Sequence, residues 1–307
     1  MPILFLTSLI WAFSFGLIKH KLNLDPSFAA FLRLLLSFLV FLPLLQPTRI
    51  SRPILAKLTI IGAVQHGLMY ALYMNAFRFL PAHLVALFTI FTPIFVTLIY
   101  DWDERVWHPH HLGAAALAVI GTGVIVAENG IQAATLLGFT IIQIANYCFA
   151  YGQIRYRSIL RKHPEIQDRH VFAAVYAGAA AAAFIPALIA LITAILGSDL
   201  SGFRPSGQDL WVITYLGIIP SGLCFFLWNA GARRAHPAVL AVMNNLKIPL
   251  AIAVALLIFQ ENANLPRLLI GGAIMLGAVL WSHRIADSEA EIDRKSTRLN
   301  SSHVSQS

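Results

Sequence analysis

The chain has 307 residues, of which 58% are hydrophobic and 12% are charged, and its mean hydropathy is +0.72. Soluble domains carry about 25% charged residues, so this composition excludes an ordinary soluble domain and predicts an all-α polytopic membrane protein. The formal net charge of +8 does not indicate a nucleic-acid-binding protein, because the basic residues fall in short gaps between apolar spans. The two cysteines, Cys148 and Cys224, lie inside apolar spans and predict neither a disulfide framework nor a metal site.

Ten apolar spans follow one another along the chain, each close to the roughly 17–25 residues that a helix needs to cross a bilayer. In chain order they are Pro2–Ile18, Ser27–Leu45, Leu58–Phe79, Leu84–Tyr100, Leu112–Ala127, Leu136–Tyr156, Val171–Leu196, Leu210–Asn229, Ala238–Ile258 and Leu268–Ser282. The first span lacks a basic leader and a small-residue cleavage site, so we expect a transmembrane helix there and not a signal peptide.

The lysine and arginine residues of the loops predict the orientation of the chain. With the N-terminus in the cytoplasm, the inner segments hold twelve of these residues and the outer segments hold five. The loop after the sixth span is the most basic inner segment. We therefore expect a multi-pass protein of the plasma (inner) membrane with both termini in the cytoplasm.

The ten spans divide into two copies of five. The segment Phe79–Phe95 resembles Ala235–Ala251 without a gap, and this alignment pairs Pro93 with Pro249. Other pairs occur in the same order: Asn75 with Asn229, Ala76 with Ala230, and Glu104 with Glu261. An odd number of spans per copy inverts the second copy relative to the first, as in alternating-access transporters. We expect repeat 1 over residues 2–127 and repeat 2 over residues 135–284.

These features together resemble the EamA family of the drug/metabolite transporter superfamily, from Leu4 to about Arg284. The resemblance rests on the first span LIWAFSFGLIK with Trp11, on Arg33, on NAFRFLPAHLVALFTIFTPIF, on the glycine-rich fifth span and on their echo in the second half. It implies ten transmembrane helices in two inverted five-helix repeats. Similar proteins export amino acids and other small metabolites. The NNLK run at Asn244–Lys247 departs from the family pattern, in which small or apolar residues are usual.

Lys247 lies near the middle of the ninth span, where a charged side chain costs about 2.5–3.5 kcal/mol on insertion scales. We predict that it faces a central cavity and either holds a substrate carboxylate or titrates as a proton-coupling group. The alternative is a structural lysine capped by carbonyls or by a fixed carboxylate. Asn244 shares its helix face and Asn245 lies one turn or less away. Pro249 leaves the carbonyl of Asn245 free and predicts a helix kink, as Pro93 does in the first copy.

Five further polar residues inside the spans are candidates for substrate binding or coupling. Arg33, about two turns into the second span, is either a second anion clamp or a residue that sets packing. His66 and Tyr70 share one face of the third span, although a single intramembrane histidine is more often a packing residue than a proton relay. Asn146 and Tyr147 belong to a similar polar stripe on the sixth span.

Trp11 predicts part of an aromatic wall, with ordinary packing as the alternative. Glu104 and Glu261 end the fourth and ninth spans, and we expect them to anchor loops or to form gate contacts on opposite sides of the membrane. No acidic residue lies inside a span, and no nucleophile–base pair occurs at that depth. We therefore predict no catalytic residue, cofactor or metal site.

The polar tail over residues 285–307 lacks apolar periodicity and is predicted to be disordered. Residues 295–307 resemble translated adapter or vector sequence, and the alternative is a genuine polar cytoplasmic tail.

We predict an inner-membrane secondary transporter that exports small organic metabolites, such as amino acids or carboxylates, by alternating access. Its partners would be the small-molecule substrate, the lipid bilayer and either a proton or a counter-substrate, and it would act as a monomer or homodimer. One alternative is a membrane sensor or structural protein without transport. The other, an intramembrane enzyme, is disfavoured because the spans lack a nucleophile–base pair.

Overall fold

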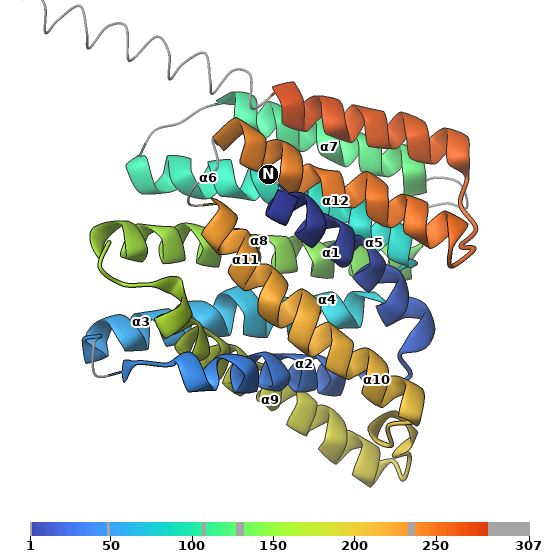
Figure 1. Cartoon of the computed structure of the whole chain (residues 1–307). Coiled ribbons are helices and arrows are strands. Elements are labelled where there is room, and N and C mark those ends of the chain that lie inside the picture. Colours follow the sequence, from blue (N-terminus) through green and yellow to red (C-terminus); the bar gives the residue numbers. More distant parts are fainter. Residues whose placement is uncertain (1, 48–49, 106–108, 127–131, 233–236, 282–307) are drawn as a thin grey trace, which may run out of the picture. The chain divides into compact units, whose positions relative to one another are not determined.

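The computed structural model describes residues 2–47, 50–105, 109–126, 132–232 and 237–281, and every regular element in these ranges is a helix (Figure 1). In chain order these are α1 (Pro2–Lys21), α2 (Pro26–Phe41), η1 (Leu42–Leu44), α3 (Arg52–Gly62), η3 (Ala63–Leu68), α4 (Met69–Ala76), α5 (Ala82–Phe88), η4 (Thr89–Phe91), α6 (Thr92–Glu104), α7 (Pro109–Val126), α8 (Ala133–Lys162), α9 (Asp168–Leu196), η6 (Ser201–Phe203), α10 (Gly207–Leu216), η7 (Gly217–Leu223), α11 (Cys224–Ala232), α12 (Pro237–Leu257) and a last helix, Leu265–Trp281. The predicted all-helical class is confirmed. The predicted disordered tail lies outside the described residues.

Seven helical segments in the described ranges are long and apolar enough to cross a membrane. They are Ile3–Lys21, Pro26–Leu44, Arg52–Ala76, Ala82–Asp103, Ala133–Lys162, Asp168–Leu196 and Gly207–Trp228. Three shorter apolar helices cover Gly113–Val126, Leu246–Leu257 and Leu265–Trp281. A polytopic membrane protein is therefore confirmed, whereas the count of ten crossings and their inverted repeat remain predictions.

Local sequence signals explain where several helices begin. The Asp25 carboxylate accepts hydrogen bonds from the backbone N–H groups of Ser27 and Phe28 at 2.9 and 3.1 Å, which caps α2. Ser206 and Asp209 form a reciprocal capping box at the start of α10. These caps satisfy backbone donors that the first turn of a helix leaves unpaired.

The chain forms two compact units. The first comprises Met1–Val96 and Ile131–Ala263, and the second comprises Thr97–Gly130 and the chain from Asn264 onward. In the second unit, α7 crosses the helix Leu265–Trp281 closely, since a Cβ added to Gly271 would lie 2.4 Å from the carbonyl oxygen of Gly121.

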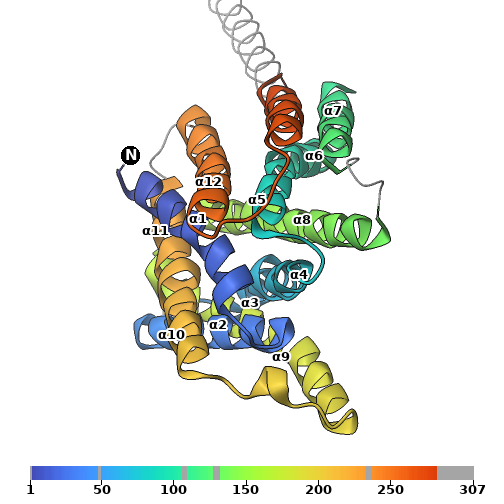
Figure 2. The same ribbon diagram turned by 90° about the vertical axis from the view of Figure 1, so that its right-hand side faces the viewer.

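Within the first unit, α9 lies beside both α2 and α3 (Figures 1 and 2). Two glycines allow α3 and α9 to touch through their backbones. A Cβ on Gly62 would lie 1.9 Å from the Val175 carbonyl oxygen, and a Cβ on Gly178 would lie 1.9 Å from that of Thr59. Small residues at such crossings are a common way for membrane helices to pack.

Two segments of the first unit, η3 and η7, are π-helices, a rare conformation that occurs mostly as short bulges at functional sites. Side chains from three other helices bind the carbonyl oxygens of η7: Ser37 binds that of Gly217 (2.8 Å), Trp11 that of Pro220 (2.9 Å) and Tyr176 that of Ser221. The segment η7 is therefore held in place from α1, α2 and α9.

The two aligned prolines lie in different local structures. Before Pro93, the chain passes from α5 through the 3₁₀ turn η4 into α6, so the span is interrupted where a kink was predicted. Around Pro249, by contrast, α12 continues as an α-helix. The interruption before Pro93 places Phe88 at the end of α5 with a carbonyl that α5 does not use.

Candidate substrate-binding site

A cavity of about 90 Å³ lies inside the first unit, lined by side chains from α1, α2, α4, η4, α6, α8, α11 and α12. Its charged side chains are those of Arg33 and Lys247. No acidic side chain occurs among the described residues that line it. The cavity therefore combines two cationic groups with walls that are otherwise neutral.

Arg33 comes from α2 and is only 1% exposed. Its guanidinium donates hydrogen bonds to Ser221 Oγ at 3.1 Å, to Tyr70 OH at 3.4 Å and to Met74 Sδ at 3.5 Å, and it lies 4.6 Å from the centre of the Tyr70 ring. In the described part of the chain these partners are all neutral. A buried charge that has only neutral partners makes the site receptive to an anion.

Lys247 comes from α12, and its ammonium lies 5.5 Å from the centre of the Trp11 ring. A cation over an indole face is favourable, and more so where water is scarce. The indole N–H of Trp11 donates to the Pro220 carbonyl at 2.9 Å, so its ring is held in a fixed orientation beside Lys247. The structure thus brings the predicted lysine and the predicted aromatic wall together.

Aromatic rings form most of the remaining wall. Those lining the cavity are Trp11, Phe15, Tyr70, Tyr73, Phe149 and Phe225. Several of them pack on one another, with ring centres 4.9 Å apart for Trp11 and Phe225 and 5.8 Å apart for Phe15 and Tyr73. This wall suits a flat or bicyclic apolar group.

Asn146 supplies a neutral polar corner from α8. Its amide nitrogen donates to the Phe88 carbonyl at 2.8 Å and to Gln143 Oε1 at 3.2 Å, and its oxygen accepts from Thr92 Oγ1 at 3.3 Å. The first of these bonds satisfies the carbonyl that the end of α5 releases. The residue therefore joins α8 to the interrupted span while it lines the cavity.

Other predicted site residues lie elsewhere. His66 is 1% exposed and packs against the rings of Tyr176 and Phe225, with centres 5.6 and 4.9 Å apart, but it does not line the cavity. Tyr147 is 47% exposed and does not line the cavity either. The side chains of Asn244 and Asn245 lie outside the described residues.

Several lining residues carry no signal in the sequence that would single them out. Phe149 and Phe225 are two of 20 phenylalanines, most of them in apolar spans. The repeat alignment could have identified Thr89, because it places this residue opposite Asn245 in the NNLK run.

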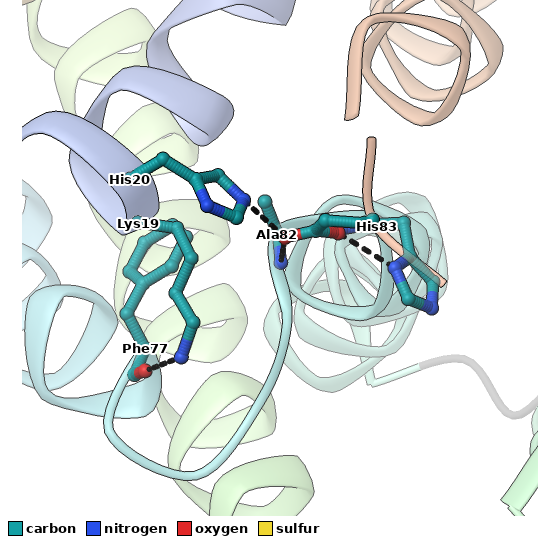
Figure 3. Close-up of polar contacts among 6 residues, drawn as sticks. Lys19, His20, Phe77, Ala82 and His83 are labelled. Carbon is teal, nitrogen blue, oxygen red and sulfur yellow. Dashed lines mark hydrogen bonds and ion pairs between the residues drawn. The ribbon is translucent and has the colours of Figure 1, made fainter. Parts of the chain in front are cut away.

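Glu261 follows α12 and joins the ends of two other helices, through His20 at the end of α1 and through Ala82 and His83 at the start of α5 (Figure 3). One carboxylate oxygen accepts from His20 Nε2 and from the Ala82 N–H, both at 2.8 Å. The other accepts from the N–H and the Nδ1 of His83 at 3.0 and 2.7 Å. In the same region Lys19 donates to the Phe77 carbonyl at 2.6 Å (Figure 3).

The environment of Glu261 favours the charged carboxylate. Burial raises its pKa, but the hydrogen bonds from His83, Ala82 and His20 outweigh burial and lower the pKa to about 2. The predicted loop anchor thus ties together the end of α1, the start of α5 and the segment after α12. The side chain of Glu104 lies outside the described residues.

Comparison with known proteins places this architecture in one family. The model of the EamA-like transporter family matches residues 1–127 and 171–282. A "Probable biotin transporter" of Pseudomonas aeruginosa is 36% identical over 293 residues, which cover 94% of this chain and 99% of that protein. The "Biotin transporter" proteins of Salmonella typhimurium and Escherichia coli are each 33% identical over 92% of this chain and 93% of their own.

A protein of known crystal structure has the same fold. It aligns with a TM-score of 0.59 at 18% identity, over 93% of this chain and 97% of that protein. The family and the names of the relatives are those of transporters and not of enzymes. This chain is a multi-pass membrane protein that belongs to the EamA-like transporter family.

Proposed function

We propose that this chain is a secondary transporter for biotin, which binds in the cavity of the first unit. The observation that carries this proposal is the pairing of Arg33 and Lys247 with an aromatic wall and with no acidic side chain among the described lining residues. The names of relatives that are 33–36% identical over nearly the whole chain support the same substrate.

The chemistry of biotin fits this cavity in outline. Biotin carries one carboxylate on a short alkyl chain and a neutral bicyclic ring system that contains a cyclic urea and a thioether. The carboxylate would form charge-assisted hydrogen bonds with Lys247 and Arg33, and the bicyclic ring system would pack against the aromatic wall. Within the predicted class of amino acids or carboxylates, the site favours a carboxylate, because the described lining residues include two cations and no acidic side chain.

The size of the cavity supports transport through a change of shape. Pockets for small ligands usually measure about 300–1,000 Å³. At about 90 Å³ the cavity is smaller than that, so the surrounding helices must separate to admit biotin. Movement of helices around a central site is what alternating access requires.

The proposed ten-helix architecture has support from the two π-helical segments. Asn75 of the first copy pairs with Asn229 of the second. The same shift along the chain pairs η3 (Ala63–Leu68) with residues 217–222, and η7 covers Gly217–Leu223. Equivalent positions in the two copies thus share a rare conformation, which supports inverted repeats over residues 2–127 and 135–284.

We assign the Glu261 contacts a gating role, because they join α5 to the ends of α1 and α12, two helices that line the cavity. A corresponding role for Glu104 remains a prediction. So do the inner-membrane location with cytoplasmic termini, the direction of export, the coupling to a proton or counter-substrate, and the monomeric or dimeric state.

Equilibrium binding to purified protein tests the substrate. We expect biotin to raise the melting temperature, because a ligand that binds only the folded state stabilises it. Replacing Lys247 with Met should weaken biotin binding about 10- to 100-fold, since hydrogen bonds to charged groups contribute about 1.5–3 kcal/mol. Lys162→Met, at the exposed end of α8, is the matched control and should bind normally. Unchanged binding by the Lys247 variant would refute the assignment.

A further inference from the structure

The hydroxyl of Ser221 connects the π-helical segment η7 to the cation Arg33 of the cavity. Arg33 Nε donates to Ser221 Oγ at 3.1 Å. Ser221 Oγ donates to Tyr70 OH at 3.2 Å, and Tyr70 OH also accepts from Arg33 at 3.4 Å, so the three side chains form a closed triangle. Arg33 and Tyr70 line the cavity and Ser221 does not, so Ser221 would act on a ligand through these two residues.

The backbone around Ser221 is fixed by two other helices. The Ser221 carbonyl accepts a hydrogen bond from Tyr176 OH of α9. The carbonyl of the preceding residue, Pro220, accepts from the Trp11 indole N–H of α1 at 2.9 Å. Ser221 itself is 0% exposed. Its hydroxyl is therefore a rigid acceptor beside the guanidinium and not a mobile surface group.

The described contacts of Arg33 leave donors for a ligand. A guanidinium has five N–H donors, and the bonds to Ser221, Tyr70 and Met74 account for three of them. One N–H on each terminal nitrogen remains, enough for a bidentate contact with a carboxylate. Such a contact depends on the orientation of the guanidinium plane, and an orientation fixed in advance lowers the cost of binding.

We propose that Ser221 is a positioning residue, which holds the Arg33 guanidinium in place for the substrate carboxylate and so sets the preference for a carboxylate over a neutral end group. This inference rests on the proposed biotin transport and adds to it a residue outside the cavity wall. A serine that served packing alone would affect charged and neutral ligands equally, and its effect would not depend on Arg33.

The test compares biotin with biotinamide, in which a neutral carboxamide replaces the carboxylate. The wild-type protein should bind biotin at least about tenfold more tightly. Ser221→Ala removes the hydroxyl without adding volume, and it should weaken biotin binding about three- to tenfold and biotinamide binding less than about twofold. In an Arg33→Met background, Ser221→Ala should change biotin binding less than about twofold, because its effect passes through Arg33.

Ser8→Ala is the matched control. Ser8 is also 0% exposed, its hydroxyl binds the Leu4 carbonyl within α1 at 2.9 Å, and it does not line the cavity, so this variant should bind both ligands normally.

Three results would overturn the proposal: equal weakening of both ligands by Ser221→Ala, an undiminished effect in the Arg33→Met background, or tighter binding of biotin. If Ser221→Ala does not fold, Tyr70→Phe removes the other hydroxyl of the triangle and should show the same selective loss, and equal weakening of both ligands by it would overturn the proposal instead. Normal biotin binding by both wild type and Ser221→Ala would refute this assignment alone, whereas a wild-type protein that binds no biotin would refute the proposed function as well.

Discussion

At the scale of single residues, the membrane makes isolated charges informative. Lys247 and Arg33 stand out in the sequence because a charge inside an apolar span is expensive, and both line the cavity. Trp11, Tyr70 and Asn146 were predicted with them and also line it. His66 was also a candidate, and in the structure it packs against the rings of Tyr176 and Phe225 and does not line the cavity.

Residues that only complete the wall could not be predicted. Phe149 and Phe225 contribute through their position in the folded bundle, and nothing in their neighbouring sequence distinguishes them from other phenylalanines. Sequence therefore predicts the charged and polar residues of a membrane site better than the apolar residues that line it.

Glu261 provides a prediction about pH. Its folded-state pKa of about 2 lies below the ordinary 4.5, so the carboxylate stabilises the fold above about pH 4.5, and this stability is lost as the pH falls toward 2. Glu261→Gln should therefore lower the free energy of unfolding at pH 7 by about 1–3 kcal/mol, and this difference should shrink between pH 4.5 and 2.

Thermal unfolding in detergent across this pH range measures the effect. Glu165→Gln is the control, because Glu165 is exposed and its pairing with His163 at 3.2 Å lies on the surface. A difference between wild type and Glu261→Gln that stays constant from pH 7 to pH 2 would contradict the assigned role of the carboxylate.

At the scale of helices, the apolar spans were predictable and their irregularities largely were not. The described part of each predicted span is largely helical, because hydropathy is set by composition over a whole helix. A kink was predicted at Pro93 from its missing N–H, but the 3₁₀ turn η4 that precedes it was not. The π-helical segments were not, because they depend on contacts such as those of Ser37 and Trp11 with η7.

The crossing of α3 and α9 yields a second prediction. In an ordinary helix interior, replacing glycine with alanine stabilises by about 0.5–1 kcal/mol. Gly178→Ala should instead destabilise the protein by about 1–3 kcal/mol, because its Cβ would lie 1.9 Å from the Thr59 carbonyl oxygen. Gly123→Ala, which would meet nothing within 4 Å, is the matched control and should be neutral or slightly stabilising. A melting temperature for Gly178→Ala at or above wild type would show that the helices separate easily.

At the scale of the whole molecule, composition was enough to predict a membrane protein, and the resemblance of its motifs to the EamA family predicted the family. The substrate was beyond them, because a buried lysine suits any small carboxylate. The cavity adds the aromatic wall, which together with the two cations favours a carboxylate that carries a flat or bicyclic apolar group.

Counterflow in proteoliposomes tests the central claim most directly, because it requires both binding and turnover and needs no knowledge of the energy source. Vesicles that contain the wild-type protein and unlabelled biotin should accumulate external radiolabelled biotin transiently, and Lys247→Met should reduce the initial rate at low biotin at least about tenfold while Lys162→Met does not. Excess unlabelled amino acids outside should leave the signal unchanged. Accumulation no greater than in protein-free vesicles, with folded protein present in the membrane, would contradict biotin transport by this chain.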